Sequence, residues 1–325
     1  MSKYIGRQVS IGLAKEAVRG TAESTPTFFE PQLELTLDEK ITQAINESAV
    51  NRIEDAQGAS VTEKMTIGSL RGIVQTESIG LWLLASIGAV STSVDDPEAG
   101  VNTHTFSVLN SAQHPSLTIF EKNPDQDRAY ALAVIETFEL AVNLNEFITF
   151  TAGFRAKKGE GASTTVSFTD QTRFIPQFAG FKTATDLSGL GAAPLIKVKQ
   201  FTLTITKNAE DDRNFGSTDP DDILNKQFVV EGSVELLFDS ATFQGLVIGD
   251  TAQAMRIELE NTDVTIGASS SPKLTIDLAK VKFSEITRGL DNNELTRQTL
   301  TFKGFYSLAD AKSIEVKLIN TTASY

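Results

Sequence analysis

The sequence predicts a mainly β protein made of two similar domains in tandem, each with one short α-helix. Three observations carry this prediction. Apolar and polar residues alternate along many segments, helical periodicity is confined to two short stretches, and the same order of elements occurs twice. The length of 325 residues also suits about two domains of ~150 residues each.

The strands are predicted from period-two alternation. In segment 33–37, leucines at every second position are separated by Glu34 and Thr36, and segments 201–205 and 274–278 repeat the pattern. Such a strand buries one face and leaves the other in water. The chain has 20 Phe against 4 Tyr and 1 Trp. Phe fills a core without needing a hydrogen-bond partner, so this composition favours packing over carbohydrate stacking.

Two short segments have helical spacing. In segment 78–87 the apolar residues follow one helical face, and Gly88 provides a stop. Trp82 lies on that face, so we expect it to pack against a sheet or, alternatively, to form a buried contact between subunits. A second helix is predicted over 239–248. Segment 38–56 also has helical spacing but is very polar, and it is predicted to be a long loop with at most a short helix.

The repeat defines the predicted domains. Segment 33–37 matches 201–205, and Gly153-Phe154 matches Gly304-Phe305 near the end of each copy. The predicted division is an N-terminal arm (1–30), a first domain (31–156), a linker rich in Gly, Ser, Thr and Ala (157–196) and a second domain (197–325). Because residue identity between the copies is low, chance matches between β-rich segments are the alternative.

The composition excludes several kinds of chemistry. The chain has no Cys, so disulfides, thiol nucleophiles and Cys metal sites are excluded. His104 and His114 are the only histidines, which leaves little for a metal site or a catalytic triad. The acidic runs 210–212 and 219–222 lack the ligand register of a Ca²⁺ loop and are predicted to be solvated. We therefore predict no catalytic residue, no cofactor and no metal ligand.

The charge is strongly acidic. With 29 Lys and Arg against 42 Asp and Glu, the formal net charge is −13. This argues against a protein that grips nucleic-acid phosphate, although a polyanion could still slide past it. Segment 1–7 lacks the pattern of a signal peptide, and no apolar stretch approaches the ~20 residues of a membrane helix. We expect a protein that is soluble and intracellular when it is synthesised.

Several segments resemble the tail tube proteins (major tail proteins) of long-tailed bacteriophages. The opening segment 11–22, IGLAKEAVRGTA, contains a G-x-x-K-E…G-T pattern that leads into Phe29-Glu30-Pro31 and an alternating strand. The second half is also similar, with Lys280-Val281-Lys282-Phe283, a polar turn at 291–293, a strand at 298–306 and a terminal strand near 318–320. The resemblance extends over nearly the whole chain and brings no catalytic motif.

The resemblance implies that each domain is a tail-tube-type β-sandwich or half-barrel of two sheets with one short flanking α-helix. It also implies a structural virion protein that self-assembles. Strands of neighbouring subunits would continue around a ring as an inner β-barrel. Rings would stack through long loops and terminal arms into a hollow tube for ejection of genomic DNA. With two domains per chain, three chains would give a pseudo-hexameric ring, whereas a one-domain arrangement would need six chains. The implied partners are tape-measure, tail terminator and baseplate proteins, without a membrane. The implied location is the virion tail, after assembly in the host cytoplasm.

The candidate contact residues lie mainly in two loops, 46–60 and 208–226, which occupy the same place in both copies. The candidates for inter-ring or inter-subunit contact are Asn46, Arg52, Glu54, Asp55, Trp82, Asp211, Asp212, Arg213 and Asp219. Acidic side chains are expected to line the lumen and repel DNA phosphate. Two other functions remain open: a monomeric two-domain β-sandwich binding module (an adhesin or carbohydrate-binding protein), and an all-β glycosidase with paired carboxylates.

Overall fold

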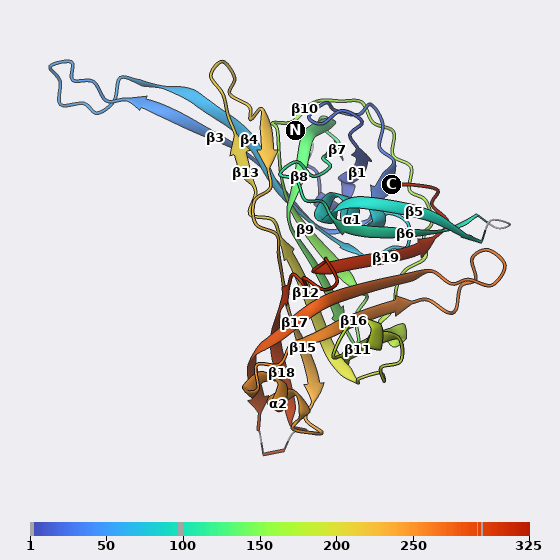
Figure 1. The fold of residues 1–325 in the computed structure, drawn as a ribbon. Helices are drawn as coiled ribbons and strands as arrows, with labels where there is room; N and C mark the ends of the chain where they lie inside the picture. Colours follow the sequence, from blue (N-terminus) through green and yellow to red (C-terminus); the bar gives the residue numbers. More distant parts are fainter. Residues whose placement is uncertain (1–2, 97–99, 291, 294) are drawn as a thin grey trace.

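A computed structural model describes residues 3–96, 100–290, 292–293 and 295–325. It is a mainly antiparallel β structure with one short helix in each half, which confirms the predicted fold class (Figure 1). The helices are α1 (Ile79–Ile87) and α2 (Thr242–Ile248), close to the predicted ranges. Gly88 ends α1 with φ 114°, a left-handed conformation that glycine adopts readily.

The strands of the first half are β1 (Ser10–Lys15), β2 (Phe28–Glu30), β3 (Gln32–Asn46), β4 (Gly58–Ile73), β5 (Gly88–Asp96), β6 (Val101–Val108), β7 (Leu117–Lys122), β8 (Arg128–Asn143), β9 (Thr149–Ala156) and β10 (Glu160–Gly161). Those of the second half are β11 (Ala179–Ala184), β12 (Val198–Thr206), β13 (Glu210–Asp212), β14 (Asp222–Leu224), β15 (Val229–Leu237), β16 (Gln253–Glu260), β17 (Lys273–Gly289), β18 (Arg297–Phe305) and β19 (Ile314–Asn320).

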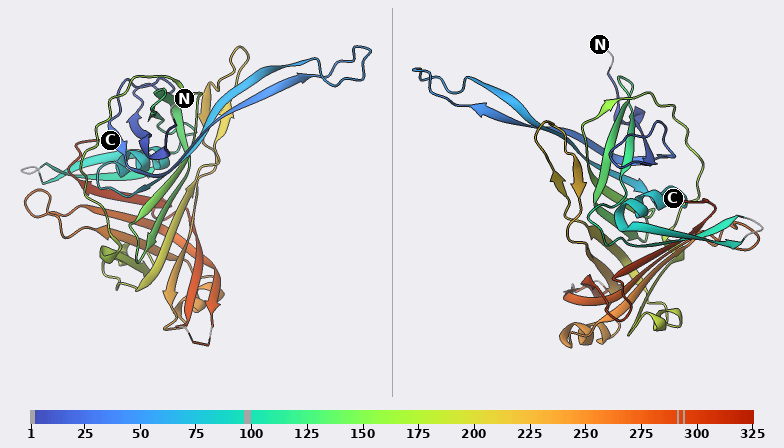
Figure 2. Two further views of the ribbon diagram at one scale, coloured as in Figure 1. Left: turned by 180° about the vertical axis from the view of Figure 1, so that it is seen from behind. Right: turned by 45° about the horizontal axis from the view of Figure 1, so that its top comes forward.

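One long antiparallel ladder runs through both halves in the order β3-β4-β9-β8-β12-β15-β18-β17. We call β3-β4-β9-β8 the first unit and β12-β15-β18-β17 the second unit, because their strands are paired in the same order. The units are joined where β8 pairs with β12 over Thr137–Asn143 and Gln200–Thr206. Figure 2 shows this continuous sheet from behind.

A β-bulge recurs at the start of each unit. The register between β3 and β4 shifts across 32–34, and the register between β12 and β15 shifts across 198–200. If the bulges are equivalent, Leu37 is the counterpart of Leu203. The sequence match instead paired Leu37 with Ile205, which is two residues away from this counterpart. Two alternating strands match equally well when one is shifted by two residues, so the pattern alone does not determine the alignment.

A second bulge recurs at the last strand of each unit. The register between β8 and β9 shifts across 135–137, and that between β17 and β18 shifts across 283–285. Phe154 and Phe302 pair at these bulges, so they are counterparts. The alignment of Gly153 with Gly304 was wrong, because it put the buried and exposed faces of the two strands out of phase.

The segments predicted as the N-terminal arm (1–30) and the linker (157–196) both contribute strands. β1, in residues 1–30, pairs with β7, and β11, in residues 157–196, pairs with β16. β7 and β16 in turn pair with the first halves of β8 and β17. Residues 189–191, within the predicted linker, form part of a 3-10 turn in which Leu190 is buried. Both segments are therefore integrated into the fold.

A long hairpin projects from the first unit. The loop predicted over 38–56 is wrong for 38–46, which continues β3 and pairs with β4 as far as Asn46 and Gly58 (Figures 1 and 2). Its side chains are polar or exposed, so hydrophobic burial does not specify this strand. The backbone ladder with β4 holds it instead. We call residues 41–63 the arm.

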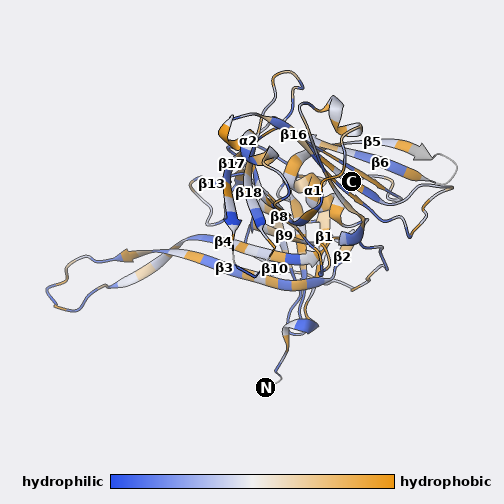
Figure 3. Ribbon diagram, turned by 90° about the horizontal axis from the view of Figure 1, so that it is seen from below, coloured by the Kyte–Doolittle hydropathy of each residue, from blue (hydrophilic) through white to orange (hydrophobic). Residues whose placement is uncertain are grey.

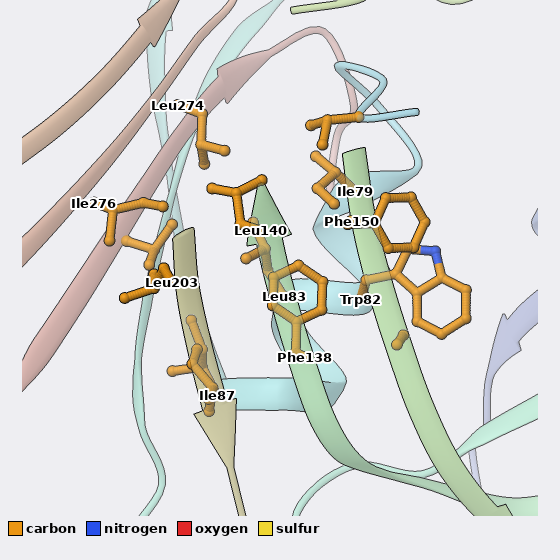
Figure 4. Close-up of a cluster of buried hydrophobic side chains, with 14 of the residues drawn as sticks. Ile79, Trp82, Leu83, Ile87, Phe138, Leu140, Phe150, Leu203, Leu274 and Ile276 are labelled. Atoms are coloured by element: carbon orange, nitrogen blue, oxygen red, sulfur yellow. The ribbon is translucent and has the colours of Figure 1, made fainter. Parts of the chain in front are cut away.

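The main core forms where α1 lies against the long sheet. All residues of α1 are buried, as expected for a helix that is apolar on every side. The ring centroids of Trp82 and of Phe150 on β9 lie 5.4 Å apart, and Figure 4 shows both side chains beside Phe138. Trp82 has no exposed surface. It therefore packs in the chain's own core, which favours the first of the two predicted roles, packing against a sheet, over a contact with another subunit.

A buried carboxyl group lies beside α1. Glu30 is 1% exposed, and burial raises its pKa from 4.5 to about 7, although nearby Ser78 and Trp82 oppose the rise. Between these pH values the folded chain holds a proton that the unfolded chain has lost, so stability falls as pH rises.

Glu30→Gln is expected to abolish this pH dependence. The wild-type free energy of unfolding should fall by about 3 kcal/mol from about pH 4.5 to about pH 7, relative to the variant. Urea titrations of both proteins across this range measure the difference. Parallel pH profiles for wild type and variant would contradict the prediction.

Candidate assembly surfaces

The long sheet ends at two open edges. β3 pairs with β4 alone, and residues 284–289 of β17 pair with β18 alone, among the residues described. Open edges present unpaired backbone groups that can pair with another chain. Lys40 on the first edge and Glu285 on the second are both exposed.

The face of the long sheet away from the helices is polar. Six of its charged side chains stand in cross-strand pairs: Lys303 with Glu231 at 2.7 Å, Arg297 with Glu235 at 3.0 Å and Arg71 with Glu34 at 3.3 Å. Glu139 on β8, between Thr151 and Thr204, is exposed. Threonines occupy many other positions on it, namely Thr36, Thr137, Thr151, Thr202, Thr204, Thr299 and Thr301. We call this the polar face. Acidic and basic groups are mixed on it.

The arm presents an apolar stripe on one side. Gln43 pairs with Val61 and Ile45 with Ala59, which places Ile41, Ile45, Ala59 and Val61 on the same side. We call these four residues the apolar stripe. Figure 3 shows apolar positions along the arm between hydrophilic ones. Monomeric proteins rarely leave such a contiguous patch in water, so it marks an interaction surface.

Four predicted contact residues lie at the tip of the arm. Asn46, Arg52, Glu54 and Asp55 are all exposed there. Asn46 caps the turn, because its side-chain oxygen accepts hydrogen bonds from the backbone N–H and hydroxyl of Ser48. The structure thus brings these residues together at the most projecting point of the chain.

The second predicted loop braces the arm. It forms the β13–β14 hairpin, and its Thr218 carbonyl accepts a hydrogen bond from the Lys64 N–H at 2.8 Å. Arg213 forms an ion pair with Glu63 on the arm. Asp211 pairs with Arg155 at 3.2 Å. These partners lie within the chain: Arg213 holds the hairpin against the arm, and Asp211 holds it against β9.

The remaining two candidates take different places in this hairpin. Asp212 is exposed and pairs with Asp222 in the β13–β14 ladder. Asp219 lies in the connecting turn, half-buried, and its N–H donates to the Ser217 hydroxyl at 3.0 Å.

The second helix is far less covered than the first. Phe243 is the one buried residue of α2, and Ile248 is 76% exposed. Phe238 and Leu295, on the neighbouring chain segments, are also exposed. We call Phe238, Ile248 and Leu295 the α2 surface. It lies at the opposite end of the molecule from the arm (Figures 1 and 2). This difference between α2 and α1 is not predicted from the sequence.

A cavity of about 960 Å³ is lined in part by a buried amine. Lys207 is 1% exposed, and its Nζ donates to the Ala85 carbonyl at the end of α1 at 2.7 Å. Burial lowers the Lys207 pKa to about 7. The amine thus connects the segment just after β12 to the end of α1.

Both histidines are packed into hydrogen-bonded sites. His104 contacts Thr92 at 2.9 Å and the Thr322 carbonyl at 2.9 Å, and His114 contacts the Leu109 carbonyl at 2.9 Å. Burial lowers the pKa of both. Within the described ranges, no group of acidic or histidine side chains could hold a metal ion. Neither described helix has the length and apolar character needed to cross a bilayer.

These features define a structural β protein whose distinctive elements are sheet edges, a projecting arm and an uncovered helix. The family described as phage tail tube protein matches residues 6–304, and the chain belongs to this family. The family assignment confirms the resemblance seen in the sequence. It makes the chain a structural component of the phage tail.

Other comparisons add little. No curated protein matches the chain. Among solved structures, one titled "Crystal structure of Hcp protein" is similar, with 11% sequence identity and a TM-score of 0.23. The match covers 42% of this chain and 96% of that one.

Proposed function

We propose that the chain self-assembles into rings that stack into a hollow tail tube, through which genomic DNA passes into the host. One observation carries the proposal: a sheet that is open at both edges already contains, at β8–β12, a junction between two equivalent units. Copies joined edge to edge in the same way would continue the sheet around a ring. Ring closure would remove the open edges, which are otherwise an aggregation hazard.

The internal junction supplies a register for the junction between chains. At β8–β12, Thr137 lies opposite Thr206. The recurring bulges make Glu285 the counterpart of Thr137 and Lys40 the counterpart of Thr206. Glu285 of one chain would therefore lie opposite Lys40 of the next, and opposite charges in direct cross-strand pairs stabilise a sheet.

Three chains per ring is the stoichiometry that the repeat favours. We infer that segments 31–156 and 197–325 are two copies of one domain, with β1 and β11 as equivalent strands contributed by the preceding segments. Equal junctions within and between chains would then give a pseudo-hexameric ring of three chains. A true hexamer of six chains is the alternative.

The polar face would line the lumen, because the helices cover the other face of the sheet. We therefore replace the expected acidic lining by one of mixed charge, because many charges of this face are paired across strands. Paired charges and hydroxyls give DNA phosphate neither a cluster of free cations to bind nor a strong repulsive field. DNA would pass without specific binding.

Stacking would also leave two unlike ends. One end of a tube would expose arms and the other would not, so different proteins would be needed to cap them. This is consistent with a tail terminator and a baseplate as partners, and with a tape-measure protein inside the tube. Assembly would take place in the host cytoplasm before the tail becomes part of the virion.

Negative-stain electron microscopy of the purified protein tests the proposal. We expect rings and hollow tubes with a regular axial repeat, because a head-to-tail contact that does not close produces a linear polymer. A persistent monomer at high concentration would contradict the proposal and favour a binding module.

A further inference from the structure

We propose that the next chain of the same ring completes the end of α2, where its Ile41 covers Ile248. This inference rests on the proposed function and deepens it, because it adds a side-chain contact on the helix side of the sheet to the backbone pairing of β17 with β3. Each junction between chains would contain one such contact.

The internal junction shows that the strand crossing from the second unit also reaches the end of α1. Lys207, directly after β12, continues the ladder, because its N–H donates to the Glu136 carbonyl of β8 at 2.9 Å. Its side chain then crosses to the Ala85 carbonyl at 2.7 Å. Contact with a helix end is therefore part of this kind of junction.

The end of α2 lacks this cover. Trp82 in α1 and Phe243 in α2 are both buried, and each lies six residues before the glycine that follows its helix. Ile248 is therefore the counterpart of Ile87. Ile87 is fully buried in the same cluster as Leu203 of β12 (Figure 4), whereas Ile248 is 76% exposed. A strand in the place of β12 is what α2 lacks among the described residues.

The uncovered helix end lies beside the open edge of β17. Asp250, just after α2, pairs with Lys282 of β17 at 2.5 Å, and the open stretch 284–289 begins two residues later. In the register of the proposed junction, the next chain brings Ile41 to the place that Lys207 occupies at the internal junction. Ile41 is 57% exposed in the single chain, so it is available for this contact.

The two helix ends call for different side chains. At α1, the Ala85 carbonyl accepts its hydrogen bond from the Lys207 amine. The counterpart of that carbonyl in α2 belongs to Leu246, and it already accepts the Thr251 N–H at 3.0 Å. A lysine there would bury an amine without this acceptor, at a cost in free energy. The isoleucine that β3 carries at this place matches the exposed Ile248 instead.

This difference would also distinguish the two junctions. A β3 edge that met α1 would leave the Ala85 carbonyl without its amine, and a β12 edge that met α2 would bury an amine against Ile248. Backbone pairing alone cannot separate these cases, because both edges offer the same ladder. The side chains at the helix ends would thus favour β17 with β3 between chains and disfavour an exchange of units between them.

Ile41→Glu tests the contact. The concentration at which half of the chains assemble should rise at least about tenfold, because a carboxylate would be buried against an apolar partner beside Asp250. Val94→Glu is the matched control, since Val94 on the distant strand β5 is 59% exposed, much like Ile41. It should leave assembly unchanged. Sedimentation velocity over a concentration series measures the fraction of chains in rings or larger assemblies.

The outcomes separate this contact from the proposed function. Assembly of Ile41→Glu at the wild-type concentration, or an equal loss with Val94→Glu, would overturn the contact while wild-type rings persist. Absence of rings from the wild-type protein would instead overturn the proposed function.

A cross-linking experiment covers the case in which Ile41→Glu misfolds. Because the chain lacks Cys, Ile41→Cys with Ile248→Cys introduces the only thiols. A short bis-maleimide should join neighbouring chains, and the ladder of products should stop at the number of chains in one ring, because the contact closes on itself. Ile45→Cys with Ile248→Cys is the control and should link poorly, since four strand residues carry position 45 roughly 13 Å further along the arm. Unlinked chains in intact rings, equal linking in the control, or a ladder without limit would overturn the contact.

Discussion

A chain carrying Lys40→Cys and Glu285→Cys is expected to oxidise into a covalently closed ring of chains. In the proposed register these positions lie directly opposite across the β17–β3 junction between copies. Directly opposite residues have Cβ atoms roughly 4.5–5.5 Å apart, which is close enough for a disulfide after small adjustments. The wild-type chain has no Cys, so every disulfide joins introduced positions, and only links between positions 40 and 285 can close a ring. Denaturing electrophoresis without reductant reads the number of linked chains.

The size of the linked product separates the two stoichiometries. A band of three chains supports the pseudo-hexameric ring, and a band of six supports the alternative. Ile41→Cys with Glu285→Cys is the matched control, because adjacent residues of β3 point to opposite faces and the thiols should not meet. Linking in the control but not in the test pair would show that the register is wrong.

Trp82→Ala is expected to lower the free energy of unfolding by about 3–5 kcal/mol, which is the usual cost of removing a large aromatic side chain from a core. Trp82 is fully buried between α1 and the sheet, in contact with Phe150. Its loss would leave a cavity under a helix that is buried on all sides and cannot easily shift to fill it. Guanidinium titration of the unassembled chain measures the change.

Val94→Ala provides the comparison for this prediction. Val94 is exposed on β5, and its truncation should change stability by less than about 0.5 kcal/mol. If Trp82→Ala cost less than about 1 kcal/mol, the core assigned to α1 would be wrong. If instead Trp82→Ala stopped ring formation without lowering stability, Trp82 would have to act between subunits after all.

The sequence predicted the parts of the fold that local physics controls. Alternation identified segments 201–205 and 274–278 as strands, and the glycines after each helical stripe placed the ends of α1 and α2. The opening motif at 11–22 indicated the family. In each case the signal lies within about ten neighbouring residues, so no knowledge of strand order is needed.

The arm could not be predicted in this way. Ile41 and Ile45 are four residues apart, a spacing that fits both a helical face and one side of a strand. The surrounding residues are polar, so neither interpretation gains support from burial. The pairing with β4 decides between them, and it joins segments separated by the turn at 47–57.

The assembly surfaces depend even more on distant contacts. Nothing near Glu285 shows that β17 is open on one side, because this follows from which strands pair elsewhere. The sequence predicts Arg213 in a loop, but it does not predict the ion pair that joins this residue to Glu63 in the other half of the chain. The uncovered state of α2 likewise follows from the absence of a covering segment, which local sequence does not encode.

A cryo-electron microscopy map of the assembled tube tests the central claim most directly. The account predicts that β17 of each chain pairs with β3 of the next, with Glu285 opposite Lys40, so that the junction between chains repeats the β8–β12 junction within them. The ring would then contain three chains with the polar face toward the lumen. A map in which β3 and β17 pair with no neighbouring chain would contradict it.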